Sequence, residues 1–190
     1  MKAIVIGATS GIGLEVARLL AQKGWQVGVG GRREELLPRL AADTPGIVAW
    51  RRIDINATEA PDHLKALADE MGGIDLYFHA SGIGYQNVAL SPDEELATVR
   101  TNGEGFTRML TAAFNMFAKQ GGGHIAAITS IAGTKGLGAA PAYSATKRFQ
   151  RHYLESLEQL AHIRHLPIRF TEIRPGFVST ALLKDDYYPL

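Results

Sequence analysis

Three side chains in the second half of the chain have the chemistry to exchange a proton with a substrate. Tyr143 and Lys147 stand four residues apart in the segment YSATK, and Ser130 lies thirteen residues before the tyrosine. Residues four apart share one face of a helix, so the lysine ammonium would lie one turn from the phenol. A nearby positive charge favours the phenolate and lowers the pKa of a tyrosine from its ordinary value of about 10. The spacing therefore predicts a general acid or base at Tyr143, with the Ser130 hydroxyl bonded to a substrate carbonyl.

A glycine-rich segment near the N-terminus predicts a nucleotide site. It follows the apolar run Ala3–Ile6, which is typical of a buried strand, and precedes apolar residues at helical spacing. In this context Gly7 permits a tight turn, Gly11 lets the backbone approach a pyrophosphate, and Gly13 allows close packing of helix on strand. The phosphates would rest on the N–H groups that begin the helix. An ordinary tight turn would show the same glycines, and the Tyr143–Lys147 pair favours the nucleotide site. The residues expected to contact the cofactor are Gly7, Thr9, Ser10, Gly11, Ile12 and Gly13.

These two motifs, at this separation, resemble the short-chain dehydrogenase/reductase family. The glycine spacing G-x-x-x-G-x-G is that family's variant, and the resemblance extends from Met1 to about Thr180. It implies that Lys147 binds a nicotinamide ribose and lowers the Tyr143 pKa, and that Asn102 holds a relay water through its backbone carbonyl. Because asparagine followed by Gly103 is a poor helix interior, we expect a kink that exposes this carbonyl. An inert break in the helix is the alternative.

The residues after the second predicted strand indicate which cofactor is preferred. Gly31 stands where a relative that prefers NAD would carry an aspartate for the ribose hydroxyl. Arg32 and Arg33 follow, and guanidinium groups bind phosphate through bidentate, charge-assisted hydrogen bonds. These residues predict NADP(H) in preference to NAD(H). The alternative is that the segment only begins a helix whose charges are solvated.

The resemblance assigns three further segments to the cofactor. One matches an adenine-contacting pair, although a turn carboxylate before a helix would have the same spacing. The second lies beside the ribose, with His79 in place of the family's asparagine and expected to be structural. The third covers the nicotinamide. In this order, the segments comprise Asp54 and Ile55; Ala80, Ser81 and Gly82; and Pro175, Gly176, Val178 and Thr180.

Composition limits the class of protein. The 190 residues suit a single domain, 1–190, and a formal net charge of +1 gives no argument for nucleic acid or an anionic membrane as partner. The absence of cysteine excludes disulfides and thiolate metal sites, and His162 and His165 lack a third ligand nearby, so no metal is expected. No apolar run approaches the roughly 20 residues of a membrane span. The first residues form a strand rather than a signal peptide, so a cytoplasmic protein is expected.

Strand-like and helix-like segments alternate, which predicts a Rossmann-type, doubly wound parallel sheet in three layers with ligands beyond the carboxyl ends of its strands. The predicted strands are Ala3–Ile6, Gln26–Gly30, Ile47–Arg52, Ile74–His79, His124–Thr129 and Ile168–Ile173. The predicted helices are Gly13–Lys23, Arg33–Asp43, Ala60–Met71, Pro92–Gln120 and Ala142–His165. The family resemblance implies a lid, a helix and a seventh strand after Thr180. Only ten residues follow here, so the usual C-terminal strand and helix are expected to be lacking.

The predicted activity is transfer of a hydride between NADP(H) and a small carbonyl or alcohol substrate. Two alternatives stay open: a non-catalytic NADP-binding regulator, and an epimerase or dehydratase of the same superfamily. A binding module has no need of a proton donor, and the glycine loop typical of the second class is absent. A homodimer or homotetramer is also expected, because both long helices carry apolar residues beyond one face. These residues include Phe106, Leu110, Phe114, Phe117, Phe149 and Tyr153.

Overall fold

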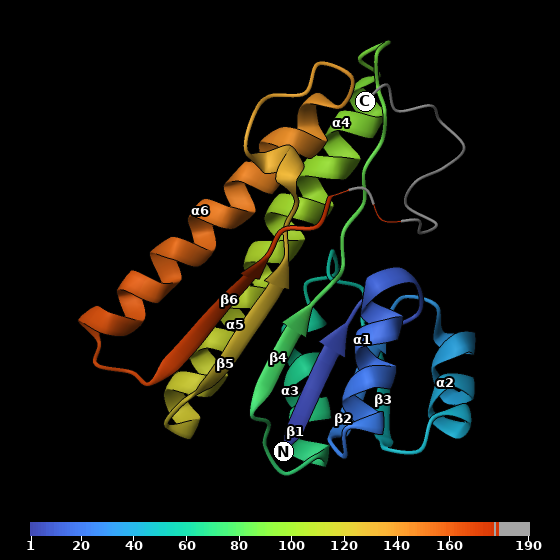
Figure 1. Ribbon diagram of the computed structural model, residues 1–190, viewed down its shortest axis with the longest axis vertical. Coiled ribbons are helices and arrows are strands. Elements are labelled where there is room, and N and C mark those ends of the chain that lie inside the picture. The colour runs from blue at the N-terminus through green and yellow to red at the C-terminus, as the bar shows by residue number, and fades with distance from the viewer. Residues whose placement is uncertain (177, 179–190) are drawn as a thin grey trace.

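A computed structural model describes residues 1–176 and 178 of the chain (Figure 1). Its strands form one parallel sheet of six, in the order β3-β2-β1-β4-β5-β6. They are β1 (Lys2–Ile6), β2 (Gln26–Gly31), β3 (Ile47–Arg52), β4 (Leu76–His79), β5 (Gly123–Ile128) and β6 (Ile168–Ile173). This order confirms the predicted doubly wound sheet and places its topological switch point between β1 and β4.

Helices cover both faces of the sheet (Figure 1). On one face lie α1 (Gly11–Gln22) and α2 (Leu37–Asp43); on the other lie α3 (Ala60–Glu70), α5 (Phe106–Gln120) and α6 (Pro141–Ile163), with α4 (Pro92–Val99) against α6. Strand β1 joins the two cores, because Ala3 and Val5 pack into one while Ile4 and Ile6 pack into the other. Side chains of a strand alternate between faces, so a centrally placed strand must be apolar throughout.

Three predicted helices match the observed ones to within two residues at each end, while two differ in kind, each for a local reason. The segment predicted as one helix over 92–120 contains a π-helical stretch, η2 (Arg100–Gly105), between α4 and α5. This stretch contains Asn102 and Gly103, so the expected kink takes the form of a wider helical turn. The segment predicted as a helix from Arg33 begins instead with a short 3-10 turn, η1 (Glu34–Leu36), and α2 follows with Pro38 in its first turn, where proline is tolerated.

The apolar residues of α5 do not form the partner surface that the sequence suggested. Phe106, Leu110, Phe114 and Phe117 are at most 3 % exposed and belong to the core. The helix packs on β5 and β6 and also against α3 and α6, so it needs apolar residues on more than one face. Of the suggested surface, Phe149 alone is well exposed, at 43 %, and its ring stacks on Tyr153 at 5.8 Å.

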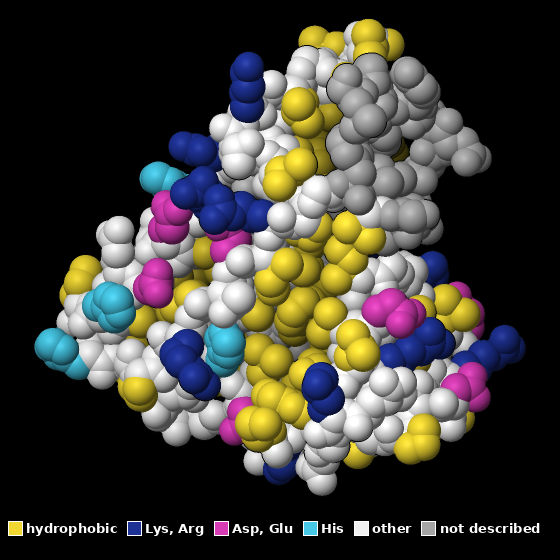
Figure 2. Space-filling view, in the orientation of Figure 1, with side chains coloured by type: hydrophobic (Ala, Val, Ile, Leu, Met, Phe, Trp, Pro, Cys, Tyr) yellow, Lys and Arg dark blue, Asp and Glu magenta, His cyan; other side chains and the backbone are white. Residues whose placement is uncertain are grey.

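Figure 2 shows apolar side chains gathered at the centre of the face seen in Figure 1, over the strands between α6 and α1, with basic and acidic side chains around them.

Within the described part of the chain, no helix combines the length and the apolar character needed to span a bilayer.

Candidate active site

A cleft of about 1080 Å³ opens at the carboxyl ends of the strands. Its walls are the loops that follow each strand, with one side formed by the first turns of α6. The lining includes Gly7 and residues 9–13 after β1, 31–33 after β2, 52–55 after β3, 80–85 after β4, 128–132 around the end of β5, and Pro175, Gly176 and Val178 after β6. Ser130, Tyr143 and Lys147 line the same cleft. The predicted site residues are thus brought together, except that Asn102 lies behind the wall and Thr180 lies outside the described residues.

The glycine loop packs so closely at Gly7 and Gly13 that neither position has room for a side chain. Gly7 has a φ of +89°, and a Cβ atom there would lie 2.7 Å from the backbone nitrogen of Ser81. A Cβ atom on Gly13 would collide with the carbonyl oxygen of Gly7. Glycine at these two positions therefore lets the loop pack directly on the segment after β4 and on the first turn of α1, while both residues still line the cleft.

The start of α1 is left without a side-chain cap. Ser10 occupies the N-cap position, but its hydroxyl does not bond the helix backbone and instead accepts a hydrogen bond from Arg33 Nη2 at 2.6 Å. The first N–H groups of a helix have no partner within the helix, so they are available to an anion. The residues present therefore fit a pyrophosphate group at this point.

Arg33 extends across the glycine loop at the edge of the cleft. Its guanidinium also donates to Thr9 Oγ1, at 2.8 Å from Nη2 and 3.1 Å from Nε. A Cβ atom on Gly31 would lie only 3.0 Å from Thr9 Cγ2, so an aspartate there would crowd this threonine. Arg32 and Arg52 also line the cleft, and Arg52 Nε lies 4.0 Å from the Glu34 carboxylate of η1, so Arg32 and Arg33 are the arginines of this lining without a carboxylate partner among the described residues.

Asp54 and Ile55 line the cleft just after Arg52, at the end of β3. The Asp54 carboxylate accepts a hydrogen bond from the backbone N–H of Asn56 at 3.1 Å. This is the bond of an Asx turn, so the turn role that the sequence left open is present. Because Asp54 also lines the cleft, the turn and a ligand contact are compatible.

Tyr143 and Lys147 lie side by side on α6, as their spacing predicts. The Lys147 ammonium is 5.7 Å from the centre of the tyrosine ring. It donates to the carbonyl oxygen of Ile128 at 3.3 Å and to Gln150 Oε1 at 3.0 Å. Lys147 is buried, and this burial lowers its pKa from 10.5 to about 8. The tyrosine ring packs closely on Gly84, where a Cβ atom would lie 2.6 Å from Tyr143 Cδ2.

Ser130 begins the short 3-10 turn η3 (Ile131–Gly133) that follows β5. Its Oγ accepts a hydrogen bond from the backbone N–H of Ala132 at 3.1 Å, which fixes the side chain at the cleft wall. A hydroxyl that accepts one hydrogen bond can still donate its own proton. Ser130 is therefore positioned to donate to an oxygen atom in the cleft.

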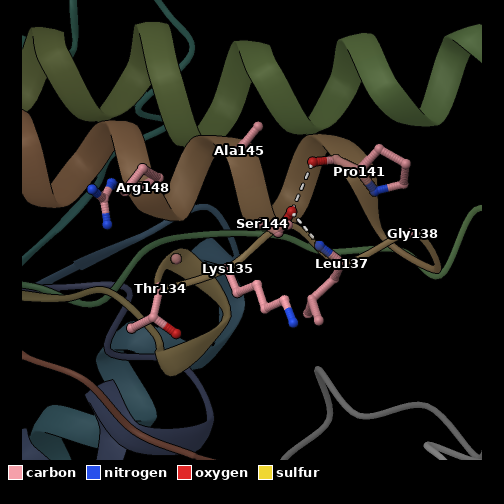
Figure 3. Close-up of a pocket in the computed structure, with 10 residues that line it drawn as sticks. Thr134, Lys135, Leu137, Gly138, Pro141, Ser144, Ala145 and Arg148 are labelled. Carbon is pink, nitrogen blue, oxygen red and sulfur yellow. Dashed lines mark hydrogen bonds between the residues drawn. The ribbon is translucent and has the colours of Figure 1, made fainter.

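The loop between η3 and α6 is fixed to the first turn of the helix that carries Tyr143. Ser144 Oγ accepts from the backbone N–H of Leu137 at 3.1 Å and donates to the carbonyl oxygen of Pro141 at 3.3 Å (Figure 3). Glu95 of α4 accepts from the backbone N–H of Ala142 at 2.9 Å and so binds the positive end of α6. These bonds position both the tyrosine and the loop opposite it.

Asn102 is fully buried, and its side chain bonds the segment after β4 twice. Its Nδ2 donates to the carbonyl oxygen of Ile83 at 2.7 Å, and its Oδ1 accepts from the Ile83 N–H at 2.9 Å. The expectation of an exposed backbone carbonyl is not met, because this oxygen accepts a hydrogen bond from Gln150 Nε2 at 2.9 Å. Sequence reasoning missed Gln150. The signal was its place three residues after Lys147, on the same face of the helix.

His79 has a structural environment, as expected. It is fully buried, its Nδ1 lies 2.8 Å from the Tyr77 hydroxyl, and its ring contacts Phe106 edge-on at 5.1 Å. Burial, and after it the charge of Lys147, lowers the pKa of His79 to about 3, so the imidazole is neutral at physiological pH. No group of three His, Asp or Glu side chains suited to a metal ion occurs in the part of the chain that the structure describes.

Known proteins similar to this chain include several that are named oxidoreductases. The sequence model of the short chain dehydrogenase family matches residues 1–187. An uncharacterized oxidoreductase of Myxococcus xanthus is 33% identical, with the match covering 99% of this chain and 76% of that protein. A crystal structure of a variant actinorhodin polyketide ketoreductase with NADPH has a TM-score of 0.84 and 28% identity, over 95% of this chain and 72% of that one. The closed form of serine dehydrogenase complexed with NADP+ has a TM-score of 0.85 and 26% identity, over 95% and 74%.

Proposed function

The chain belongs to the short-chain dehydrogenase family and is an oxidoreductase of that family, and from this premise we propose that it transfers a hydride between NADP(H) and a small carbonyl or alcohol substrate. One observation carries the proposal: Ser130, Tyr143 and Lys147 line the same cleft as an uncapped glycine-rich helix start. The proposed proton donor Tyr143, the proposed hydrogen-bond donor Ser130 and the proposed nucleotide-binding helix start therefore line one cleft.

The described residues offer a partner for each part of the cofactor. The N–H groups at the start of α1 would bind the pyrophosphate, and Arg32 and Arg33 the ribose phosphate that distinguishes NADP from NAD. Asp54 and Ile55 would contact the adenosine, residues 80–82 a ribose, and Pro175, Gly176 and Val178 the nicotinamide end. The bound cofactor supplies the hydride chemistry. Two similar solved structures hold NADPH and NADP+, which supports the phosphorylated cofactor.

Tyr143 exchanges the proton in this mechanism. In the reducing direction its hydroxyl donates a proton to the substrate carbonyl oxygen, and the phenolate that remains is stabilised by the Lys147 ammonium. Ser130 donates a hydrogen bond to the same oxygen and favours the charge that develops there. Below pH of about 8 Lys147 is charged, so this stabilisation is present at neutral pH. Asn102 supports the site from behind by holding the segment that contains Ile83.

The apolar lining of the cleft beyond Tyr143 favours substrates with an apolar group. This part of the wall consists of Ile83, Tyr85, Ile131, Leu137 and Ala140. Such surfaces bind aliphatic and aromatic groups by burying them from water. We therefore propose neutral ketones and aldehydes, with the corresponding alcohols, as the substrate class.

The test is consumption of NADPH in the presence of a panel of aliphatic and aromatic ketones and aldehydes, followed at the cofactor absorbance. The expected result is turnover of at least one panel member by the parent and a far slower reaction by the Tyr143→Phe variant. A protein that binds NADPH but turns over no carbonyl or alcohol would favour the regulator over the enzyme. Release of a product with cofactor unchanged would favour an epimerase or dehydratase.

We also propose that the chain forms a homodimer or homotetramer through the outer surface of α4 and α6. This surface includes Leu96, Val99 and Phe149, which are between 43 % and 59 % exposed. Tyr153 stacks on Phe149 and its hydroxyl lies 2.7 Å from that of Thr111 on α5, so the aromatic pair is held in place. Ordered aromatic side chains at a surface are common in protein interfaces.

A further inference from the structure

A buried carboxamide connects two residues of the proposed site. Gln150 is fully buried on α6, one turn beyond Lys147. Its Oε1 accepts from the Lys147 ammonium at 3.0 Å, and its Nε2 donates to the backbone carbonyl of Asn102 at 2.9 Å. A buried amide is costly unless its polar atoms are bonded, so these two contacts fix the side chain in this orientation.

The same contacts fix the lysine. An ammonium group has three N–H donors. Two of them are used inside the protein, by Gln150 Oε1 and by the Ile128 carbonyl at 3.3 Å. The third is left for a group in the cleft, where the ammonium stands 5.7 Å from the Tyr143 ring. The orientation of Lys147 toward the cleft thus depends on Gln150.

We propose that Gln150 is a positioning residue that bridges Lys147 to the Asn102 carbonyl and takes the place, in this chain, of the relay water expected at that carbonyl. The inference rests on the proposed function, which assigns Lys147 to the proton donor. A water molecule in that position both accepts and donates hydrogen bonds and can pass a proton along. A carboxamide makes the same two hydrogen bonds but does not titrate near neutral pH. The inner end of the relay is therefore closed, and Tyr143 and Lys147 exchange protons with solvent through the cleft.

Few other charged groups act on Lys147, so its pKa should respond mainly to changes at Gln150. Among the described residues, the titratable groups that face it are Tyr143 on its own helix and His79 from β4, which is neutral at physiological pH. Its partner from β5 is a backbone carbonyl, and η3 packs Gly133 against its main chain. Among the described residues no carboxylate contributes to the Lys147 pKa, which burial alone lowers. A substitution at position 150 should therefore change the Lys147 pKa directly, with no change in a neighbouring carboxylate to obscure it.

The experiment compares Gln150→Leu, Gln150→Ala and Gln150→Glu with the parent. The titration of the Lys147 side chain is followed by ¹³C NMR without cofactor or substrate, and its resonance is assigned by its loss in Lys147→Met. Gln150→Leu removes a hydrogen bond to a charged group, so the Lys147 pKa should fall by about one to two units. Gln150→Glu places a carboxylate beside the ammonium and should raise it by roughly one to three units.

The order of the alanine and leucine variants separates positioning from packing. Gln150→Ala leaves a polar cavity between the ammonium and the Asn102 carbonyl, where a water can bind, so its Lys147 pKa should stay nearer to that of the parent than in Gln150→Leu. With NADPH and a substrate, turnover of the alanine variant should exceed that of the leucine variant. A packing role predicts the reverse order, because leucine fills the space and alanine leaves a void.

Several results would overturn the inference. A Lys147 titration that is the same in the parent, Gln150→Leu and Gln150→Glu would exclude a positioning role. If the variants do not fold, hydrogen exchange of the Gln150 side chain in the parent still tests the inference. A bridging carboxamide has slowly exchanging N–H groups, so rapid exchange would contradict the bridge.

A parent that neither binds NADPH nor reduces a carbonyl would refute the proposed function alone, since the lysine titration needs neither ligand.

Discussion

Removal of the Arg33 side chain should change the cofactor preference of the protein. The guanidinium is held by three hydrogen bonds to Thr9 and Ser10, beside the glycine loop. It is therefore oriented before a ligand arrives, and little side-chain freedom is lost on binding a phosphate. Gly31 offers no carboxylate to the ribose hydroxyls of NAD, so the parent should bind NADPH more tightly than NADH.

A hydrogen bond to a charged group contributes about 1.5–3 kcal/mol. Loss of the Arg33 bonds to a ribose phosphate should therefore weaken NADPH binding by roughly 10- to 150-fold, at about 1.4 kcal/mol for each factor of ten. Arg32 also lines the cleft, and Arg32→Ala should cause a loss of about the same range or less. NADH binding should be almost unchanged in both variants, because NADH lacks the phosphate.

Dissociation constants for NADPH and NADH can be measured by quenching of protein fluorescence, at low and at moderate salt. Since Arg33 is exposed, the loss should be smaller at the higher salt concentration. Arg39→Ala is the matched control, because this exposed arginine of α2 is outside the cleft lining and the same charge is removed. Equal affinities of the parent for both cofactors, or equal losses for both in Arg33→Ala, would refute the reasoning.

Three further predictions concern stability and assembly. Gly13→Ala should lower the free energy of unfolding, measured in urea, by about 1–3 kcal/mol, because the added Cβ atom would collide with Gly7. Gly136→Ala is the control and should have almost no effect, because a Cβ atom there has no neighbour within 4 Å. Equal losses in the two variants would contradict this prediction. Between pH of about 8 and 10.5, Lys147 carries a proton in the unfolded chain but not in the folded chain. The free energy of unfolding should therefore rise with pH in this range, by up to about 3 kcal/mol relative to Lys147→Met. A difference between the two proteins that does not change with pH would argue against the lowered pKa. Phe149→Glu should convert the proposed homo-oligomer to a monomer, as measured by light scattering. Leu19→Glu, at an exposed position on α1, is the control and should leave the oligomer intact. An oligomer that persists in Phe149→Glu would exclude this interface.

Much of the fold followed from local patterns in the sequence. Apolar runs such as Ala3–Ile6 mark strands buried on both faces, and the alternation with helices determines a doubly wound sheet. Such a sheet brings the ends of all its strands to one edge, so motifs far apart in the sequence converge without any knowledge of side-chain contacts. This is why nearly all of the predicted site residues that the structure describes line one cleft, with Asn102 as the exception.

The features that the sequence did not reveal depend on tertiary packing. A phenylalanine at position 114 or 117 has the same local pattern whether a helix faces a partner chain or a second layer of its own domain, and here both are core residues. The spacing of Gln150 places it on the same helix face as Lys147, but it does not show that the residue is buried or that the Asn102 carbonyl, in the π-helical segment η2, lies within hydrogen-bond distance. The use of Ser10 by Arg33 in place of a helix cap likewise arises only when β2 and the glycine loop are adjacent.

The central claim, that Tyr143 is the proton donor of an NADP(H)-dependent reaction, is tested most directly by single-turnover kinetics of Tyr143→Phe with NADPH and a substrate of the parent. The substitution removes one hydroxyl and keeps the ring that packs on Gly84, so the melting temperature and the NADPH dissociation constant should be close to those of the parent. The rate of carbonyl reduction should fall by at least about a hundredfold, the usual contribution of a general acid. A variant that binds NADPH normally and reduces the substrate at nearly the parent rate would contradict the account.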